Sequence, residues 1–68
     1  MPNITVELLA GRSIAQRREF VAAVTDAAVS ILNAKQASVR IRFDEITRED
    51  VANGGQLESD RAAASSAT

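Results

Sequence analysis

Residues 1–9, which read MPNITVELL, carry the alternating pattern from which the fold can be predicted. Ile4, Val6 and Leu8 alternate with polar residues, and this period of two is typical of a β-strand with one buried face. Pro2 stands at the first position of the strand, where its missing amide costs no ladder hydrogen bond. If Met1 is removed, the nitrogen of Pro2 becomes a free secondary amine and a candidate base.

A long helix is predicted to follow, over residues 14–32. Gly11 ends the strand, and Ser13 and Gln16 have the spacing of a capping box. Apolar residues then recur at steps of three and four, which gives the helix one core face. Asn33 suits the left-handed conformation that closes a helix. A helix of this length spans about 28 Å and the strand about 26 Å, so the two can pack along their full lengths.

A second strand is predicted over residues 39–43, where apolar and arginine side chains alternate. A strand, a helix and a strand form a β-α-β unit, and its right-handed crossover makes the two strands parallel. Residues 44–50 are acidic and are interpreted as a turn, and Asn53-Gly54-Gly55 indicates a short hairpin. The predicted fold class is α+β: a single β-α-β protomer with two parallel strands, one long helix and a C-terminal hairpin.

The chain is interpreted as one small domain, residues 1–57, followed by a mobile tail, residues 58–68, that is low in complexity and lacks an apolar anchor. A chain of this size buries only about 60% of its unfolded surface, and a two-stranded sheet is not stable alone. No Cys is present to form a disulfide. We therefore expect a homo-oligomer in which sheets join across subunits.

The charge balance excludes several classes of partner. There are 8 Lys+Arg against 9 Asp+Glu, so the chain lacks the broad positive field typical of nucleic-acid binding. Neither a signal peptide nor an apolar run of membrane-spanning length is present, which favours a cytoplasmic protein with no membrane partner. His and Cys are absent, so the commonest metal ligands are missing, and no metal or cofactor is expected.

Candidate proton carriers are few, because His, Cys and Tyr are all absent. The carboxylates, Lys35 and the amino terminus remain. An α-amino group titrates near about 7.7–8.0, and nearby cations and desolvation lower the pKa of an amine. A freed Pro2 could therefore serve as a base and then as an acid near neutral pH. The alternative is that Pro2 only begins the strand.

Arginine supplies seven of the eight basic residues, and its planar guanidinium suits carboxylate recognition. Arg12 lies at the junction of strand and helix, where the first-turn amides already favour anions. Arg40 and Arg42 lie two residues apart on one strand and therefore point the same way. They could bind an anionic ligand, or Glu7 or Asp44 could pair with them in surface ion pairs.

The ordered set of short motifs resembles the 4-oxalocrotonate tautomerase family, and the resemblance extends over nearly the whole chain up to about Leu57. The motifs are Met1-Pro2, Gly11-Arg12-Ser13 at the start of a helix, Ser38-Val39-Arg40-Ile41, and Gly54-Gly55. The resemblance implies a β-α-β protomer, dimers that join their sheets into four strands, and a hexamer built as a trimer of dimers.

The same resemblance implies an activity, that of an isomerase of aromatic compound catabolism. Pro2, freed of Met1, would be the general base in enol-keto tautomerisation of a small unsaturated 2-oxo acid or dicarboxylate such as 2-hydroxymuconate. Arg40, from a neighbouring subunit, would hold the 2-oxo-acid end, and Arg12 would bind the far carboxylate. Val51 would line the substrate pocket, and Arg42 is a further candidate for substrate binding.

Three departures from the family leave alternatives open. Val51 stands where the family usually has an aromatic residue, Arg42 occupies a commonly apolar position, and Ala52 replaces a usual glycine. Asp50 lies beside Val51 and is another candidate substrate-binding residue. A related decarboxylase or hydratase, in which Asp50 or Glu49 polarises water, is one alternative. A dehalogenase ranks lower, because Leu9 stands where those relatives use an arginine. A non-catalytic oligomeric binding module is the other alternative.

Overall fold

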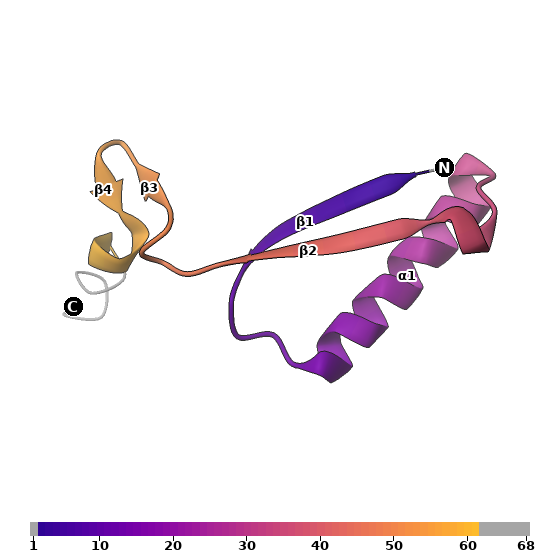
Figure 1. The fold of residues 1–68 in the computed structure, drawn as a ribbon, viewed down its shortest axis with the longest axis horizontal. Coiled ribbons are helices and arrows are strands. Elements are labelled where there is room, and N and C mark those ends of the chain that lie inside the picture. Colours follow the sequence, from indigo (N-terminus) through magenta and orange to yellow (C-terminus); the bar gives the residue numbers. More distant parts are fainter. Residues whose placement is uncertain (1, 62–68) are drawn as a thin grey trace.

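The computed structural model describes residues 2–61 and has the predicted β-α-β order (Figure 1). The elements are β1 (Asn3–Leu9), α1 (Ile14–Leu32), the short 3-10 helix η1 (Gln36–Ser38) and β2 (Arg40–Ile46). β1 and β2 pair in parallel, from Asn3 opposite Arg40 to Leu9 opposite Ile46. The predicted fold class is confirmed. The predicted removal of Met1, and residues 62–68 of the predicted tail, lie outside the described residues.

Both ends of α1 follow from local sequence. The Gln16 amide donates to Ser13 Oγ at 3.1 Å, and the Ser13 amide donates to Gln16 Oε1 at 2.9 Å, which completes the predicted capping box. Gly11 precedes it with φ 122°, a conformation that other residues rarely adopt. Asn33 closes the helix in the left-handed conformation, with φ 57°. The predicted helix limits are confirmed.

β2 is longer than predicted, since it continues through Asp44 and Glu45 to Ile46. The interpretation of residues 44–50 as a turn is therefore wrong for residues 44–46. The physical reason is pairing with β1. The two strands stay in register as far as Leu9 opposite Ile46, and the Ala10 amide donates a hydrogen bond to the Ile46 carbonyl at 2.8 Å. Such pairing outweighs the weak strand preference of acidic residues.

The predicted hairpin is present, formed by β3 (Ala52–Asn53) and β4 (Gln56–Leu57) in antiparallel pairing. Gly54 and Gly55 have φ 60° and 81°, and tight hairpin turns of this kind need two positive φ angles. Figure 1 shows the hairpin beyond the C-terminal end of β2, away from α1.

Residues 58–61, the first part of the predicted tail, are helical. The Glu58 amide donates to the Val51 carbonyl at 2.8 Å, and the Ser59 amide donates to the Arg48 carbonyl at 3.0 Å. These bonds join the chain after β4 to the segment that precedes β3.

The two faces of the sheet differ in character. The face toward α1 carries apolar residues, with Ile4 opposite Ile41 and Val6 opposite Phe43. The Phe43 ring meets the Phe20 ring of α1 at 6.1 Å between centroids. The other face carries three polar pairs in succession along the strands: Asn3 with Arg40, Thr5 with Arg42, and Glu7 with Asp44.

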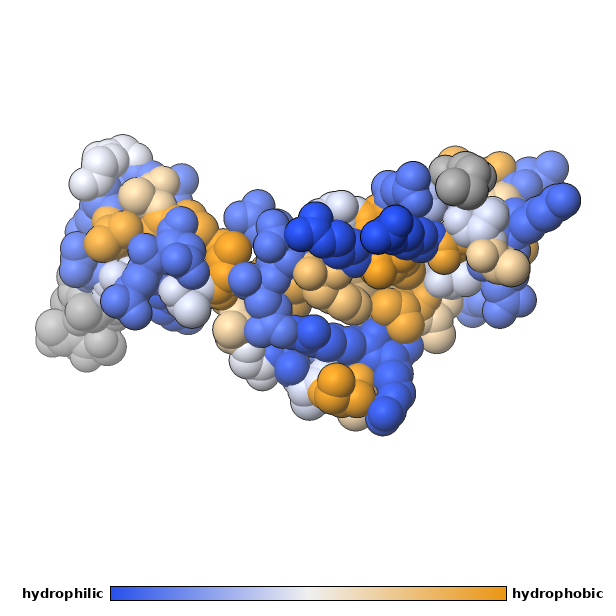
Figure 2. All heavy atoms as spheres, in the orientation of Figure 1, coloured by the Kyte–Doolittle hydropathy of each residue, from blue (hydrophilic) through white to orange (hydrophobic). Residues whose placement is uncertain are grey.

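The protomer leaves much apolar surface uncovered, and Figure 2 shows hydrophobic atoms at the surface of both the β-α-β unit and the hairpin. Ala28 is the only buried apolar side chain among the residues described, whereas Ile31 and Leu32 are 78% and 65% exposed. The radius of gyration is 16.0 Å, against about 11 Å for a compact chain of this length. No helix within residues 2–61 is long and apolar enough to cross a membrane.

Candidate active site

Pro2 and Arg40 lie together at one end of the sheet. The Arg40 amide donates to the Pro2 carbonyl at 3.0 Å, so the bond fixes the start of β2 beside the start of β1. Pro2 is half-buried and Arg40 is exposed. The resemblance implies that the working Arg40 comes from a neighbouring subunit, and that assignment stays a prediction.

Arg40 and Arg42 share a groove of about 270 Å³ on the polar face of the sheet. Its other lining residues are Asn3, Ile4 and Thr5. The ion pairs found within residues 2–61 are Arg17 with Glu45 and Arg61 with Glu58, so neither groove arginine is paired within the described part of the protomer. Two guanidinium groups are therefore available to an anion at the Pro2 end of the sheet.

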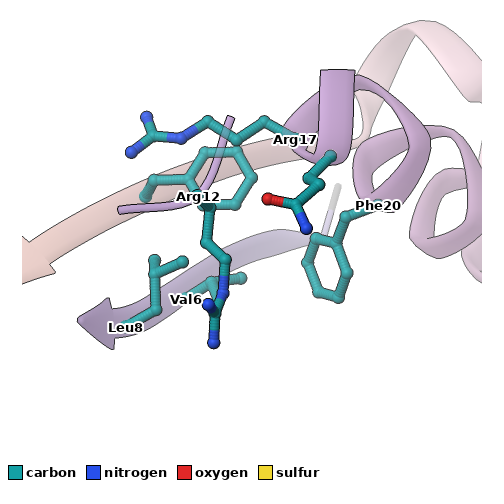
Figure 3. Close-up of a pocket in the computed structure, with 7 residues that line it drawn as sticks. Val6, Leu8, Arg12, Arg17 and Phe20 are labelled. Atoms are coloured by element: carbon teal, nitrogen blue, oxygen red, sulfur yellow. The ribbon is translucent and has the colours of Figure 1, made fainter. Parts of the chain in front are cut away.

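Arg12 lies elsewhere, at a groove of about 310 Å³ between α1 and the apolar face of the sheet. Figure 3 shows Phe20 from α1, and Val6 and Leu8 from β1, around this space, with the Arg12 side chain beside them. Gln16, Arg17 and Phe43 complete the lining. The groove thus combines an apolar interior with a cationic side chain.

Arg17 also lines this groove, and it was not predicted from the sequence as a site residue. It forms an ion pair with Glu45, and its guanidinium carbon lies 5.1 Å from the centroid of the Phe43 ring. Its Nε atom is buried and has no hydrogen-bond partner among the described residues. The Arg17–Glu45 ion pair could have been predicted if the second strand had been extended through Glu45. In an extended strand Glu45 points to the same face as Phe43, which is the face toward α1.

Pro2 and Arg12 stand at opposite ends of β1. The strand has seven residues, and at about 3.3 Å per residue it separates them by about 23 Å. A six-carbon dicarboxylate is too short to contact both residues of one protomer. If they share a substrate, the two residues must come from different chains.

Val51 and Asp50 also lie away from Pro2, on the segment that joins β2 to the hairpin (Figure 1). Asp50 Oδ2 accepts from the Thr47 amide at 2.9 Å and from Thr47 Oγ1 at 2.8 Å, and its own amide donates to the Thr47 carbonyl at 3.0 Å. The carboxylate therefore closes a turn over residues 47–50. These bonds, the backbone one first, hold the pKa of Asp50 below its ordinary value of 3.8.

This turn gives a pH prediction. The pKa of Asp50 is lower in the folded protein than in the unfolded chain, so its stabilising effect is present above the unfolded pKa and is lost as pH falls through the folded value. We expect the Asp50 carboxyl resonance to titrate with a midpoint below 3.8, and the Thr47 amide to exchange faster in Asp50→Ala. Glu49→Ala is the matched control. A midpoint at or above 3.8 would contradict the role of the turn.

Comparison with known proteins decides the family. The family model described as Tautomerase enzyme matches residues 2–61. The chain belongs to the tautomerase family. Its resemblance to 4-oxalocrotonate tautomerases is confirmed, because solved homologues of that enzyme share its fold.

Three relatives illustrate how similar this tautomerase-family chain is to known proteins in sequence and structure. It is 33% identical over 60 residues to a probable tautomerase of Listeria innocua, covering 88% of this chain and 98% of the relative. A 4-oxalocrotonate tautomerase isozyme from Methylibium petroleiphilum is 40% identical with a TM-score of 0.86, covering 93% and 98% of the two chains. A heterohexameric 4-oxalocrotonate tautomerase from Chloroflexus aurantiacus is 27% identical with a TM-score of 0.79, covering 88% and 97%.

Proposed function

We propose that this tautomerase-family chain is an isomerase that catalyses enol-keto tautomerisation of a small unsaturated 2-oxo acid or dicarboxylate such as 2-hydroxymuconate. The observation that carries the proposal is the position of Pro2, half-buried at the tip of β1 and hydrogen-bonded through its carbonyl to the amide of Arg40. The family match and the two arginine-bearing grooves support it.

The chemical step moves one proton. Once Met1 has been removed, the Pro2 nitrogen takes the proton from the enol hydroxyl of the substrate, and the electron pair of that O–H bond forms the carbonyl. The conjugated double bonds shift along the chain, and Pro2 returns the proton to a more distant carbon. No electrons are lost or gained overall, so the reaction needs no redox cofactor.

The arginines stabilise the intermediate. Negative charge develops on the dienolate, and cations placed where that charge accumulates lower the barrier more than they stabilise the ground state. In this proposal Arg40 holds the 2-oxo-acid end, Arg12 binds the far carboxylate and draws electron density toward it, and Val51 lines the pocket.

A second copy of the chain is needed to bring these groups together. The Pro2 carbonyl and the Ala10 amide form hydrogen bonds with β2. The backbone N–H and C=O groups of the even-numbered residues of β1 therefore point toward β2, and those of the odd-numbered residues point away from it, along the other edge. That edge is unpaired among the described strands. Antiparallel pairing of two copies across it would place Pro2 of one copy near Arg12 of the other.

This pairing would produce a four-stranded sheet. We propose a homo-oligomer built from such dimers, a hexamer arranged as a trimer of dimers, acting in the cytoplasm on a small carboxylate substrate. The exposed apolar residues Ile31 and Leu32 would supply further contact area between copies.

The proposal is tested by intact mass and an ultraviolet assay on the purified protein. We expect a mass that lacks Met1, together with ketonisation of 2-hydroxymuconate or phenylenolpyruvate above the uncatalysed rate. Active protein that retains Met1 on every chain would exclude Pro2 as the base, because an acylated proline nitrogen is an amide without basicity. Asp50 is engaged in its turn, and no hydratase or decarboxylase function is proposed.

A further inference from the structure

We propose that Arg42 forms, together with Arg40, a binding groove for two neighbouring carboxylates, so that the end of the ligand held by β2 is a compact dicarboxylate. The inference rests on the proposed function only for the reaction that the ligand undergoes. Arg42 is then a specificity-determining residue. Within the substrate class proposed above, it favours short dicarboxylates over 2-hydroxymuconate, which has a single carboxylate at the end held by β2.

The geometry of β2 supports two anchors in place of one. Arg40 and Arg42 are two residues apart on the same face, so their Cα atoms lie about 6.6 Å apart. Both side chains are exposed and line the same groove of about 270 Å³. Each guanidinium can offer a planar pair of donors to one carboxylate.

The charge of the groove favours a dianion. The cross-strand neighbours of the two arginines are Asn3 and Thr5, which are uncharged and can donate hydrogen bonds. A single carboxylate in the groove would leave one positive charge uncompensated. Two carboxylates neutralise both guanidinium groups, which otherwise repel each other.

The acidic residues of the same face do not fill this role within the described part of the protomer. Glu7 and Asp44 stand directly opposite each other in the next register pair, but no ion pair joins either of them to Arg42. The polar face thus has two cations at the Pro2 end and two anions further along. This polarity directs a small dianion to the end of the sheet where Pro2 lies.

Binding is measured by calorimetry with malonate, which has two carboxylates on one carbon, and with propionate, which has one. We expect the wild-type protein to bind malonate at least about tenfold more tightly than propionate, since charge-assisted pairs of this kind are the strong ones. Arg42→Gln is expected to lose most of this preference, and Arg42→Lys to keep part of it. Arg18→Gln, an exposed arginine on α1, is the matched control and should keep all of it.

Three results would overturn the inference. The first is equal affinity for malonate and propionate in the wild-type protein. The second is inorganic phosphate binding as tightly as malonate, which would indicate a general anion site. The third is an Arg42→Gln variant that keeps the malonate preference but dissociates into smaller oligomers. That result would indicate that Arg42 forms an ion pair between copies of the chain.

A kinetic experiment adds a second readout. Arg42→Gln should raise KM about tenfold for the enol of a four-carbon 2-oxo dicarboxylate, while KM for phenylenolpyruvate stays within about twofold, because only the first carries two carboxylates, one at each end of its short chain. A parallel rise in both KM values would contradict the inference. If no enol is turned over but malonate binding depends on Arg42, the proposed function fails and the binding groove stands.

Discussion

Replacing Pro2 with alanine is expected to lower kcat for 2-hydroxymuconate by at least about 100-fold, in the range that a positioned general base contributes. Alanine at the amino terminus still offers a primary amine, but it lacks the ring that holds the nitrogen in place at the tip of β1. Because the base acts on bound substrate, the main change should be in kcat, with KM changing less. The measurement is the ultraviolet ketonisation assay on protein whose amino-terminal residue has been verified by mass.

The control for this variant keeps the proline and blocks its nitrogen. A leucine inserted between Met1 and Pro2 leaves the ring in the chain, but its nitrogen becomes an amide and cannot take a proton. We expect the inserted protein to be as inactive as Pro2→Ala. If either protein kept wild-type kcat, Pro2 would only begin the strand, and a non-catalytic oligomeric module would be the better interpretation.

Activity is expected to return when two inactive variants, Pro2→Ala and Arg12→Ala, are produced in the same cell. The reason is the separation of about 23 Å between these residues in one protomer, which requires them to meet across a subunit boundary. In a mixed dimer one site carries both substitutions and the other site carries neither. Random pairing should therefore restore about one quarter of the wild-type activity, since half of the dimers are mixed and each has one intact site.

The matched control is the double variant Pro2→Ala/Arg12→Ala mixed with Arg12→Ala, which offers no site with both residues intact and should recover nothing. Size-exclusion chromatography should show the same assembly for every mixture. Recovery no greater than the sum of the separate variants would contradict a site shared through Arg12. Wild-type activity in Arg12→Ala alone would remove that residue from the proposal.

Much of the fold was predictable because the signals are local. The capping box of Ser13 and Gln16, the left-handed Asn33 and the glycine pair of the hairpin each act within a few residues, and the structure contains all of them. The alternation in residues 1–9 likewise defined β1 and its buried face. These features depend on neighbouring residues only, so a sequence reports them directly.

The end of β2 was not predictable by the same means. Asp44 and Glu45 are poor strand formers, and only the ladder offered by β1 keeps them extended. The extension of β2 also affects the candidate site. It brings Glu45 into an ion pair with Arg17, which lines the same groove as Arg12. The sequence also suggested Asp50 as a candidate for polarising water, whereas the structure engages its carboxylate in the turn with Thr47.

Local sequence patterns were enough to predict the parallel β-α-β order, the limits of α1 and the residues that can carry charge or a proton. The folded chain adds which of these residues share a groove, with Arg40 and Arg42 together at the Pro2 end of the sheet and Arg12 with α1 at the other end. Alternation and capping act over a few residues, whereas the grouping of side chains from different elements depends on strand pairing and register. Pro2, the candidate base, and Arg12, the candidate residue for binding the far carboxylate, therefore lie at opposite ends of one protomer. In the proposed mechanism a second copy of the chain brings a Pro2 and an Arg12 together.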